Sequence, residues 1–490
     1  MSLNNALMIA SQSLGTISSQ ISLVSRNISS AETDSATKKT SIITTGVNGG
    51  SEFKGVRRET NEPIFRNLLA TNSRLAASAR MSDALDQIDL NLNLSDPSES
   101  RTPALLISRL SDTLISYSSN PDDRTSAELV LQAAREVVIT LRESSRLTHD
   151  LRIQADENIA NSVKSINEIL NKIHALNQDI ISFANSGIDA TDIMDRRDNF
   201  LKELSVFIGI KTVTRPNQDL VIYADNGATL LETSPRSVSF QRSTNLFAGE
   251  EGLDIYIDGV QSTGPGTRTP LISGMIVGDL TIRDELAPIY QAQLDEIARV
   301  LISNFSEKDQ SGDGNPPLPG LFTVSGSIMA LNSTLISGLS DKITINPSVD
   351  PDQGGDSMLL RDGGISGNAK YIYNKDESVG FKSRILELAG SISINNNFDT
   401  KAGLNYNGTL RGFSEASIGW IGAQRQKATR EKTYENAIVT QSISLLSSLT
   451  GVNVDEQVTI MLSLENSFQA SARLLQTINS IYDSLFAAIN

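Results

Sequence analysis

Two histidines and two groups of acidic residues are the side chains in this sequence whose types could do chemistry. His149 and His174 lie in one stretch without proline or glycine, where a helix would hold them roughly 37 Å apart. At that separation one chain cannot bring both to a metal ion or a catalytic triad. We therefore interpret them as solvated helix histidines.

The segment 192–198, DIMDRRD, is dense in charge. Its carboxylates could form an acid–base pair. Alternatively, its aspartates could lie at the positive end of a helix dipole and pair with the neighbouring arginines. We favour the second interpretation, because no histidine, cysteine or glycine-rich loop accompanies the cluster.

A loop with Asp309, Asp313 and Asn315 contains part of a calcium-binding pattern. The spacing does not fit an EF-hand and no glutamate stands at the twelfth position, so we interpret it as a turn. The chain has no cysteine, which excludes disulfides, thiolate catalysis and cysteine-ligated zinc. We predict no catalytic, cofactor-binding or metal-binding residues, and a protein that is not an enzyme.

Composition favours an elongated structural protein. The chain has 490 residues, of which 39% are hydrophobic and only 5% aromatic, which suits two to four domains with thin packing. A net charge of −15 disfavours phosphate backbones and anionic lipid. We therefore expect neither nucleic acid nor membrane as a partner.

The first residues do not resemble a cleavable signal peptide, because no basic start precedes a continuous apolar stretch. We also find no apolar run long enough to cross a membrane. If the protein leaves the cell, it uses a route other than signal-peptide export.

Both ends of the chain carry apolar residues at alternating steps of three and four, which is the heptad pattern of a helix that pairs with another helix. At the N-terminus these seam residues are Leu3, Leu7, Leu14, Ile17, Ile21, Val24 and Ile28, with Ala10 in step. At the C-terminus they are Met461, Leu464, Phe468, Leu475, Ile478, Tyr482, Leu485 and Ile489.

The seams leave three interpretations open: an internal coiled coil, docking to neighbouring subunits, or a membrane-bound amphipathic helix. The third is disfavoured, because the first 25 residues lack the Lys and Arg that contact lipid head groups. Seams at both extreme ends favour segments that pair within the chain and between subunits. We predict these residues as subunit-interaction residues.

Long helices and a β-rich middle are expected between the seams. Residues 29–50 lack periodicity and read as an extended or loop connection, and 62–94 read as a helix. A longer helix is predicted from Asn120, as its cap, and Pro121 to Gly187; it would measure roughly 90–95 Å.

Short strands are expected at 220–223, 238–240 and 253–257, the last one entering a turn at Asp258 and Gly259. Helices follow at 283–305 and from about 378. The predicted fold is mainly α, elongated and multi-domain, with paired terminal coiled-coil helices, a long-helix bundle and an inserted α+β or β-rich region. We divide it into a terminal helical domain (1–45 with 446–490), a bundle domain (46–205 with 371–445) and a β-rich domain facing solvent (206–370).

The termini resemble those of the axial proteins of the bacterial flagellum, and among these the hook-associated proteins. The N-terminal stretch NNALMIASQSLGTISSQISLVSRNISS and the C-terminal stretch GVNVDEQVTIMLSLENSFQASARLLQTINSIYDSL carry the resemblance. Internal segments are also similar: MDRRDNFLKELS, through Asp195, Arg197 and Asp198; NGATLLE; and QLDEIA, residues 293–298. The C-terminal stretch is the most specific part.

The resemblance implies an extracellular part of the flagellum at the junction between hook and filament, exported uncleaved through the flagellar type III channel. Its terminal helices would form an inner tube, with the long helices in the next layer. It implies other copies of itself as partners, together with hook protein, hook-associated protein 3 and an export chaperone at the C-terminal helix.

Two alternatives stay open. The chain could be another axial protein, hook-associated protein 3 or flagellin. Less favoured is an extracellular adhesin or enzyme carried on helical arms, because residues 206–370 show no group of residues that could form its site.

Overall fold

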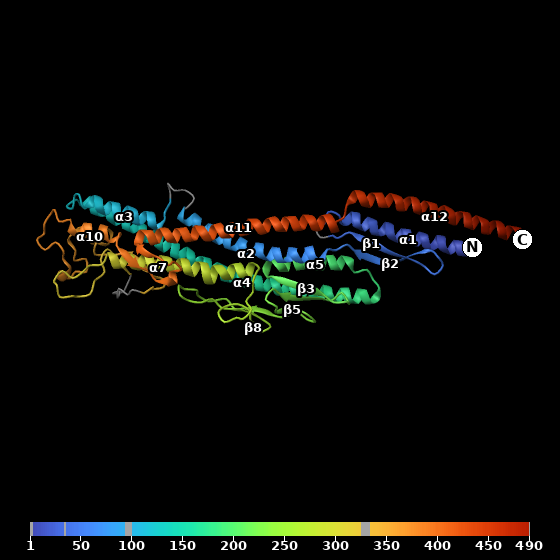
Figure 1. Cartoon of the computed structure of the whole chain (residues 1–490), viewed down its shortest axis with the longest axis horizontal. Helices are drawn as coiled ribbons and strands as arrows, with labels where there is room; N and C mark the ends of the chain where they lie inside the picture. The colour runs from blue at the N-terminus through green and yellow to red at the C-terminus, as the bar shows by residue number, and fades with distance from the viewer. Residues whose placement is uncertain (1–2, 34–35, 94–99, 325–333, 490) are drawn as a thin grey trace.

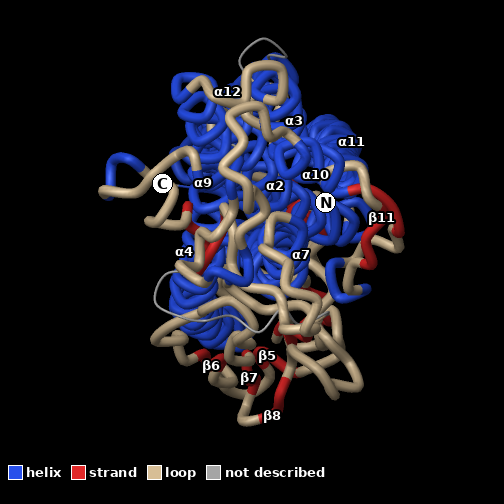
Figure 2. The backbone as a smooth tube through the Cα atoms, turned by 90° about the vertical axis from the view of Figure 1, so that its left-hand side faces the viewer, coloured by secondary structure: helices blue, strands red, loops and turns tan. Residues whose placement is uncertain are grey.

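The computed structural model describes residues 3–33, 36–93, 100–324 and 334–489 of the chain. The molecule is elongated and built mainly from long helices, with both termini at one end (Figure 1). Seen along the long axis, the helices gather together and several short strands lie to one side (Figure 2). The predicted fold class, a mainly α, elongated chain with small β elements, is confirmed.

The helices have the following bounds: α1 Leu3–Ser30, α2 Glu62–Leu92, α3 Pro103–Tyr117, α4 Arg124–Ser186, α5 Thr191–Phe207, α6 Met275–Thr281, α7 Ala287–Asn304, α8 Leu339–Lys342, α9 Leu359–Asp362, α10 Ser383–Ser391, α11 Leu410–Thr450 and α12 Val454–Ile489. A π-helical segment, η1 Ile282–Leu286, joins α6 to α7, and short 3-10 turns are η2 Pro351–Gln353, η3 Ala369–Tyr371 and η4 Thr400–Ala402.

The strands are all short and antiparallel, in five separate sheets of the described residues. They are β1 Lys39–Thr45 with β2 Ser51–Arg58; β3 Ile210–Thr214, β4 Leu220–Ala224 and β5 Thr229–Leu231; β6 Val238–Phe240, β7 Ile255–Ile257 and β8 Val260–Gln261; β9 Phe322–Val324 with β10 Ile343–Ile345; and β11 Asn395–Asn397 with β12 Asn407–Thr409.

The longest helix, α4, has 63 residues, and both apolar cores of the molecule pack against it. It begins later than expected, because Asp123 and not Asn120 is the cap: the Asp123 carboxylate accepts the N–H groups of Thr125 and Ser126, both at 3.1 Å. These bonds satisfy donors that a helix start otherwise leaves free. Its end at Gly187, with φ of 70°, is as predicted.

The connection after α1 is a β-hairpin. An extended or loop connection was predicted over residues 29–50, and its second half is extended, but the pairing of β1 with β2 was not predicted. Strands β1 and β2 pair in register from Lys39 with Arg58 to Thr45 with Ser51, with an irregularity at Ile42 and Ile43. The turn contains Gly49 at φ 82°, a conformation that favours glycine. The strand signal was weak because the hairpin has Ser and Thr at many positions and no clean alternation.

Three strands of the β-rich middle, β4, β6 and β7, lie at the predicted positions, although β7 begins at Ile255 and not at residue 253. β7 leads through Asp258 and Gly259, at φ 52° and 77°, into β8. Two successive left-handed residues are typical of the tight hairpin turn that matches strand twist. These small sheets do not form a core alone, because their buried residues join those of the long helices.

Two apolar cores share α4 as a common wall. One core surrounds its first half, with residues of α2, α3, α7, β9, β10, α10 and α11. The other surrounds its second half, with residues of α5, β3 to β7 and α6. Among the described residues, neither core includes a buried residue of α1, β1, β2 or α12. The terminal elements are therefore packed separately from the body.

A pair of buried arginines holds the segment between β6 and β7 to this body. Arg152 on α4 donates to the carbonyl oxygens of Leu246 and Phe247, at 3.1 and 2.9 Å. Arg283, on the π-helical segment, donates to Leu253 O at 2.9 Å. A Cβ atom on Gly252 would lie 2.2 Å from the Arg283 guanidinium, so any side chain at this position would have to displace the arginine from its contacts.

Helix α6 packs closely on α2 and carries a buried acid. A Cβ at Gly278 would lie 2.7 Å from Ala77 O. Next to it, Asp279 is 1% exposed; it accepts Asn158 Nδ2 at 3.3 Å and faces Arg80 Nε at 3.7 Å. Burial raises the pKa of Asp279 to about 6, and Arg80 and Asn158 offset this only in part.

We expect Asp279→Asn to stabilise the protein at alkaline pH. The folded-state pKa of Asp279 lies above its ordinary value of 3.8, so protonation favours the folded state, and that stability is lost as pH rises through about 6. The loss amounts to about 3 kcal/mol by pH 8, and asparagine avoids it. Urea unfolding followed by circular dichroism at pH 4 to 8 measures the difference.

The control is Asp83→Asn, which removes a carboxylate of α2 that is 59% exposed and pairs with Lys432 at 2.9 Å. It should change the free energy of unfolding little at any pH. An Asp279→Asn protein with the pH dependence of the wild type would contradict the prediction.

Candidate assembly interface

The two terminal helices lie side by side. α1 runs away from the end that carries both termini, and α12 runs back toward it, so the two are antiparallel (Figure 1). The β1–β2 hairpin packs along α1, where Thr16 Oγ1 donates to Ser51 O at 2.8 Å. We call α1, β1, β2 and α12 the terminal unit, and the rest of the chain the body.

On α1 the structure turns the predicted seam inward to different degrees. Ile17 and Val24 are buried, as is Ala10. The remaining seam residues are partly buried: Leu3, Leu7, Leu14, Ile21 and Ile28. The pairing of this helix within the chain is thus real, but it leaves part of most seam side chains in contact with solvent.

On α12 the seam is covered less. Ile478 is buried, and Met461, Leu464, Leu475 and Tyr482 are partly buried. Phe468 and Leu485 remain 41% and 51% exposed. The side chain of Ile489 lies outside the described residues. A single partner helix therefore does not cover this seam.

Further apolar side chains are exposed around the seam of α12 and beside it. On α12 they are Val454, Val458, Ile460, Leu462, Leu474, Ile481 and Phe486; at the end of α11 they are Ile443, Leu445 and Leu449; on the hairpin they are Ile42, Ile43 and Val47. A helix that is apolar over several faces is normally buried on several faces, and contiguous exposed patches mark interaction sites.

These exposed apolar residues bear on the expectation that no apolar run of the chain is long enough to cross a membrane. By length and composition, one helical stretch of the described chain, Leu410–Ala488, is apolar enough to cross a membrane, with 17% of its most apolar window buried. The sequence had suggested no such run, because the residues are spaced as heptads and polar residues interrupt them. Length and composition alone do not distinguish a membrane helix from one that other subunits cover.

A buried polar cluster, which we call the joint, connects the terminal unit to the body. Its members are Asn27 of α1, Lys39 of β1, Arg58 of β2, Asp195 of α5 and Gln457 of α12. Asn27 and Gln457 are each 1% exposed, and Asn27 Nδ2 donates to Gln457 Oε1 at 2.9 Å. Asn27 also bonds to the backbone of Lys39, by Nδ2 to O at 2.9 Å and by Oδ1 from N–H at 3.2 Å.

Asp195 is the part of the joint that belongs to the body. Its carboxylate lies 3.1 Å from Lys39 Nζ and 3.2 Å from Arg58 Nη1, and it accepts the Thr37 hydroxyl at 2.8 Å. The Lys39 side chain is only 2% exposed. Asp192, one turn earlier, also binds Lys39, but it is 56% exposed.

The interpretation of segment 192–198 as local Arg–Asp pairing is wrong in its partners. Asp195 and Asp198 bind Arg58 of the hairpin. Arg197 donates instead to Asn177 Oδ1 and Gln218 O, both at 2.9 Å, and burial lowers its pKa to about 10, so it stays charged at neutral pH. Arg58 and Asn177 lie far from segment 192–198 in the sequence, so the sequence showed the charged segment but not its partners.

The other candidate residues are engaged in structural contacts. His149 bonds to Leu246 O at 3.1 Å and stacks on Phe247, so it is not simply solvated; His174 bonds to Gln178. Asp309 accepts the N–H groups of Ser311 and Asn315, at 2.8 and 3.0 Å, which closes the loop on itself. In the described chain, no group of three metal-ligating side chains forms.

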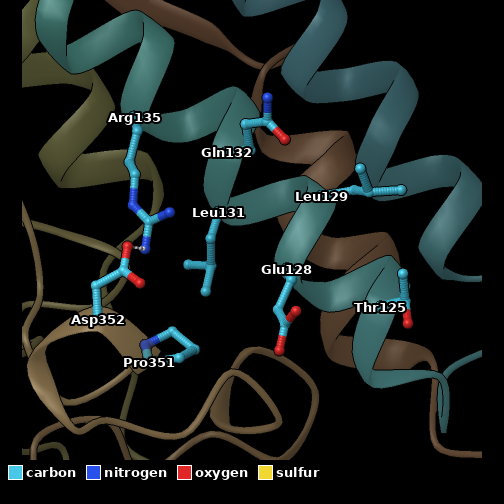
Figure 3. Close-up of a pocket in the computed structure, with 8 residues that line it drawn as sticks. All are labelled: Thr125, Glu128, Leu129, Leu131, Gln132, Arg135, Pro351 and Asp352. Carbon is cyan, nitrogen blue, oxygen red and sulfur yellow. Dashed lines mark ion pairs between the residues drawn. The ribbon is translucent and has the colours of Figure 1, made fainter.

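A surface pocket of about 360 Å³ lies between the first turns of α4 and the turn at Pro351 (Figure 3). Arg135 extends across it to Asp352, with the nitrogen and oxygen 2.7 Å apart. Arg135 also pairs with Asp350. The one arginine of the lining is thus engaged by two aspartates, Glu128 adds a further carboxylate, and nothing in the lining indicates a ligand.

Comparisons find known proteins that are similar to this chain. Residues 89–318 match the family described as "Flagellar hook-associated protein FlgK helical domain". The chain is 22% identical to flagellar hook-associated protein 1 of Escherichia coli (strain K12), over 99% of this chain and 98% of that protein. It is 20% identical to the protein of the same name from Bacillus subtilis (strain 168), over 95% and 90%.

Among solved structures, the flagellar hook junction protein FlgK from Burkholderia pseudomallei is similar, with 21% identity, a TM-score of 0.42 and coverage of 53% of this chain and 47% of that one. The sequence relatives match from end to end, and the matched helical domain covers the middle of the chain. The chain is thus similar to flagellar hook-associated protein 1 over nearly its whole length, and its residues 89–318 match the helical domain of that protein family.

Proposed function

We infer that this chain is a structural component of the bacterial flagellum that forms the junction between hook and filament. The observation that carries the inference is the terminal unit. Its helix α12, together with the adjoining end of α11, presents exposed apolar residues that belong to neither core of the body. The relatives of the chain are hook-associated proteins along their full length. Burial of such side chains between subunits contributes roughly 1.5–3 kcal/mol each.

We further propose the division of labour among the parts of the chain. The terminal unit forms the inner layer of the assembled structure, the helices around α4 the next layer, and the small sheets β3 to β8 face solvent. Partners are other copies of this chain, the hook protein and hook-associated protein 3. An export chaperone covers α12 before assembly, and the chain leaves uncleaved to the cell exterior. No catalytic role is proposed.

Removal of the chain from cells tests this function. A strain without it should make hooks of normal length that carry no filaments, and should release flagellin as monomers into the medium, because the filament has no junction to grow from. Electron microscopy of the hooks and immunoblotting of the medium give both results. Normal filaments would overturn the proposal, and loss of hooks as well would favour a different axial protein.

A further inference from the structure

The terminal unit is connected to the body by polar contacts, whereas the body itself is held together mainly by its two apolar cores. The terminal unit contributes no buried residue to either described core. The contacts that connect it, besides the chain itself, include the hairpin against α5 and the joint of Asn27, Lys39, Arg58, Asp195 and Gln457. Arg26 of α1 also pairs with Asp189 at 2.6 Å, and Arg58 with Asp198 at 2.6 Å. Apolar contacts are non-directional, whereas hydrogen bonds and ion pairs depend on angle.

The Asp195 carboxylate binds donor groups of the residue Thr37 before β1, of Lys39 at the start of β1 and of Arg58 at the end of β2. Thr37 N–H and Oγ1 donate to it at 3.3 and 2.8 Å, and Lys39 and Arg58 pair with it at 3.1 and 3.2 Å. The carboxylate is 8% exposed and Lys39 is 2% exposed. These donors come from Thr37, from Lys39 of β1 and from Arg58 of β2, so rotation of the hairpin relative to α5 would change several of these distances at once.

Asn27 extends the constraint to both terminal helices. Its side-chain amide bonds to both the backbone N–H and the backbone carbonyl oxygen of Lys39, and to the side chain of Gln457 in the first turn of α12. Beside it, Lys38 donates to Glu456 at 2.7 Å, and Lys38 N–H donates to Thr450 O at 2.7 Å. The bonds therefore run without a gap from α12 through α1 and β1 to α5.

We propose that Asp195, Lys39 and Asn27 are positioning residues that fix the angle at which the terminal unit leaves the body. Polar contacts cost stability in a buried site, and here they set one orientation among the many that the chain connections allow. The inference concerns a single chain, so it does not depend on the flagellar role. Its consequence for assembly is that every copy would present its exposed apolar residues in the same direction.

A distance measurement across the joint tests this directly. The chain has no native cysteine, so Lys164→Cys on α4 and Ser467→Cys on α12 provide unique spin-label positions at exposed sites. Pulsed electron resonance should give one narrow distance distribution in the parent. With Asp195→Ala we expect a distribution at least about twice as wide, because the ion pairs that define the angle are gone.

A second variant separates orientation from stability. Lys39→Met with Asp195→Leu removes both charges together, which leaves no buried unpaired charge, so the thermal midpoint should stay near that of the parent while the distribution still widens. The control is Asp192→Ala, which removes the exposed partner of the same lysine and should leave the distribution narrow. A narrow parental distance in both Asp195 variants would overturn the proposal.

Discussion

Arg283→Met is expected to lower the free energy of unfolding by about 3–5 kcal/mol, because it leaves a buried carboxylate without its partner. Arg283 is fully buried. Its Nη1 lies 2.8 Å from Asp156 Oδ1, and that carboxylate is 2% exposed. The guanidinium also lies over the ring of Phe240, 5.7 Å from its centre. Methionine fills much of the volume but replaces none of these polar contacts.

Denaturation in urea, followed by circular dichroism and by protection of residues 242–254 in hydrogen exchange, measures the loss. The matched control is Arg242→Met, whose partner is Glu157, next to Asp156. That pair is 3.7 Å apart and about half exposed on both sides, so the change should cost under about 1 kcal/mol. Equal effects of the two substitutions would show that burial of Arg283 is not what makes it important.

A double variant identifies the cause. Arg283→Met with Asp156→Leu removes both charges, and exchange of a buried ion pair for apolar residues is often neutral or stabilising. It should recover most of the lost stability, although Ser243 N–H then loses the carboxylate that it contacts at 3.0 Å. If the double variant is less stable than Arg283→Met, the loss of stability comes from the lost contacts to residues 242–254 and not from the unpaired charge of Asp156.

The parts of the fold that sequence reasoning predicted are those that depend on local spacing. The heptads at both ends, the length of α4 and its stop at Gly187 follow from a repeat or from one residue's backbone preference. The pairing of the hairpin was missed because contacts with distant residues hold it in place. Lys39 of β1 is bound by Asn27 of α1 and Asp195 of α5, and Ser51 of β2 accepts a hydrogen bond from Thr16 of α1. No local window of sequence includes these partners.

The joint shows why a sequence can reveal one member of a site but not its partners. Asp195 was visible as part of a dense charge cluster, but its partner Lys39 lies 156 residues earlier, and Asn27 bonds to a residue 430 positions away. A charge cluster alone is compatible with a solvated helix end. Only burial distinguishes the two readings: the Asp192 side chain is 56% exposed and that of Asp195 is 8% exposed.

The same distinction applies to the seams. Spacing predicted which residues form them, and the structure shows that α1 covers only part of α12. Heptad positions do not specify how many partners a helix has, since that depends on the residues at flanking positions. Leu462 and Leu474 lie outside the predicted seam and are 57% and 52% exposed in the single chain. The proposed function therefore predicts that a second face of α12 is covered in the assembled state.

Leu462→Asp should therefore block incorporation into the flagellum without unfolding the chain. In the isolated chain Leu462 is 57% exposed, so the substitution should change the free energy of unfolding by about 0.5 kcal/mol or less. Between subunits it loses roughly 1.5–3 kcal/mol of apolar burial and adds an unpaired buried carboxylate in every copy. We expect at least about a tenfold drop in junction protein on purified hooks.

The control is Ile139→Asp, which places the same charge on α4 of the body at a position that is 51% exposed, far along the chain from the terminal unit. It should assemble as the parent does. Immunoblots of the medium show whether each variant is exported, and swimming in soft agar shows whether filaments function. Incorporation of exported Leu462→Asp at the parental level would mean that the exposed face of α12 does not meet another subunit, and the apolar residues there would need a different partner.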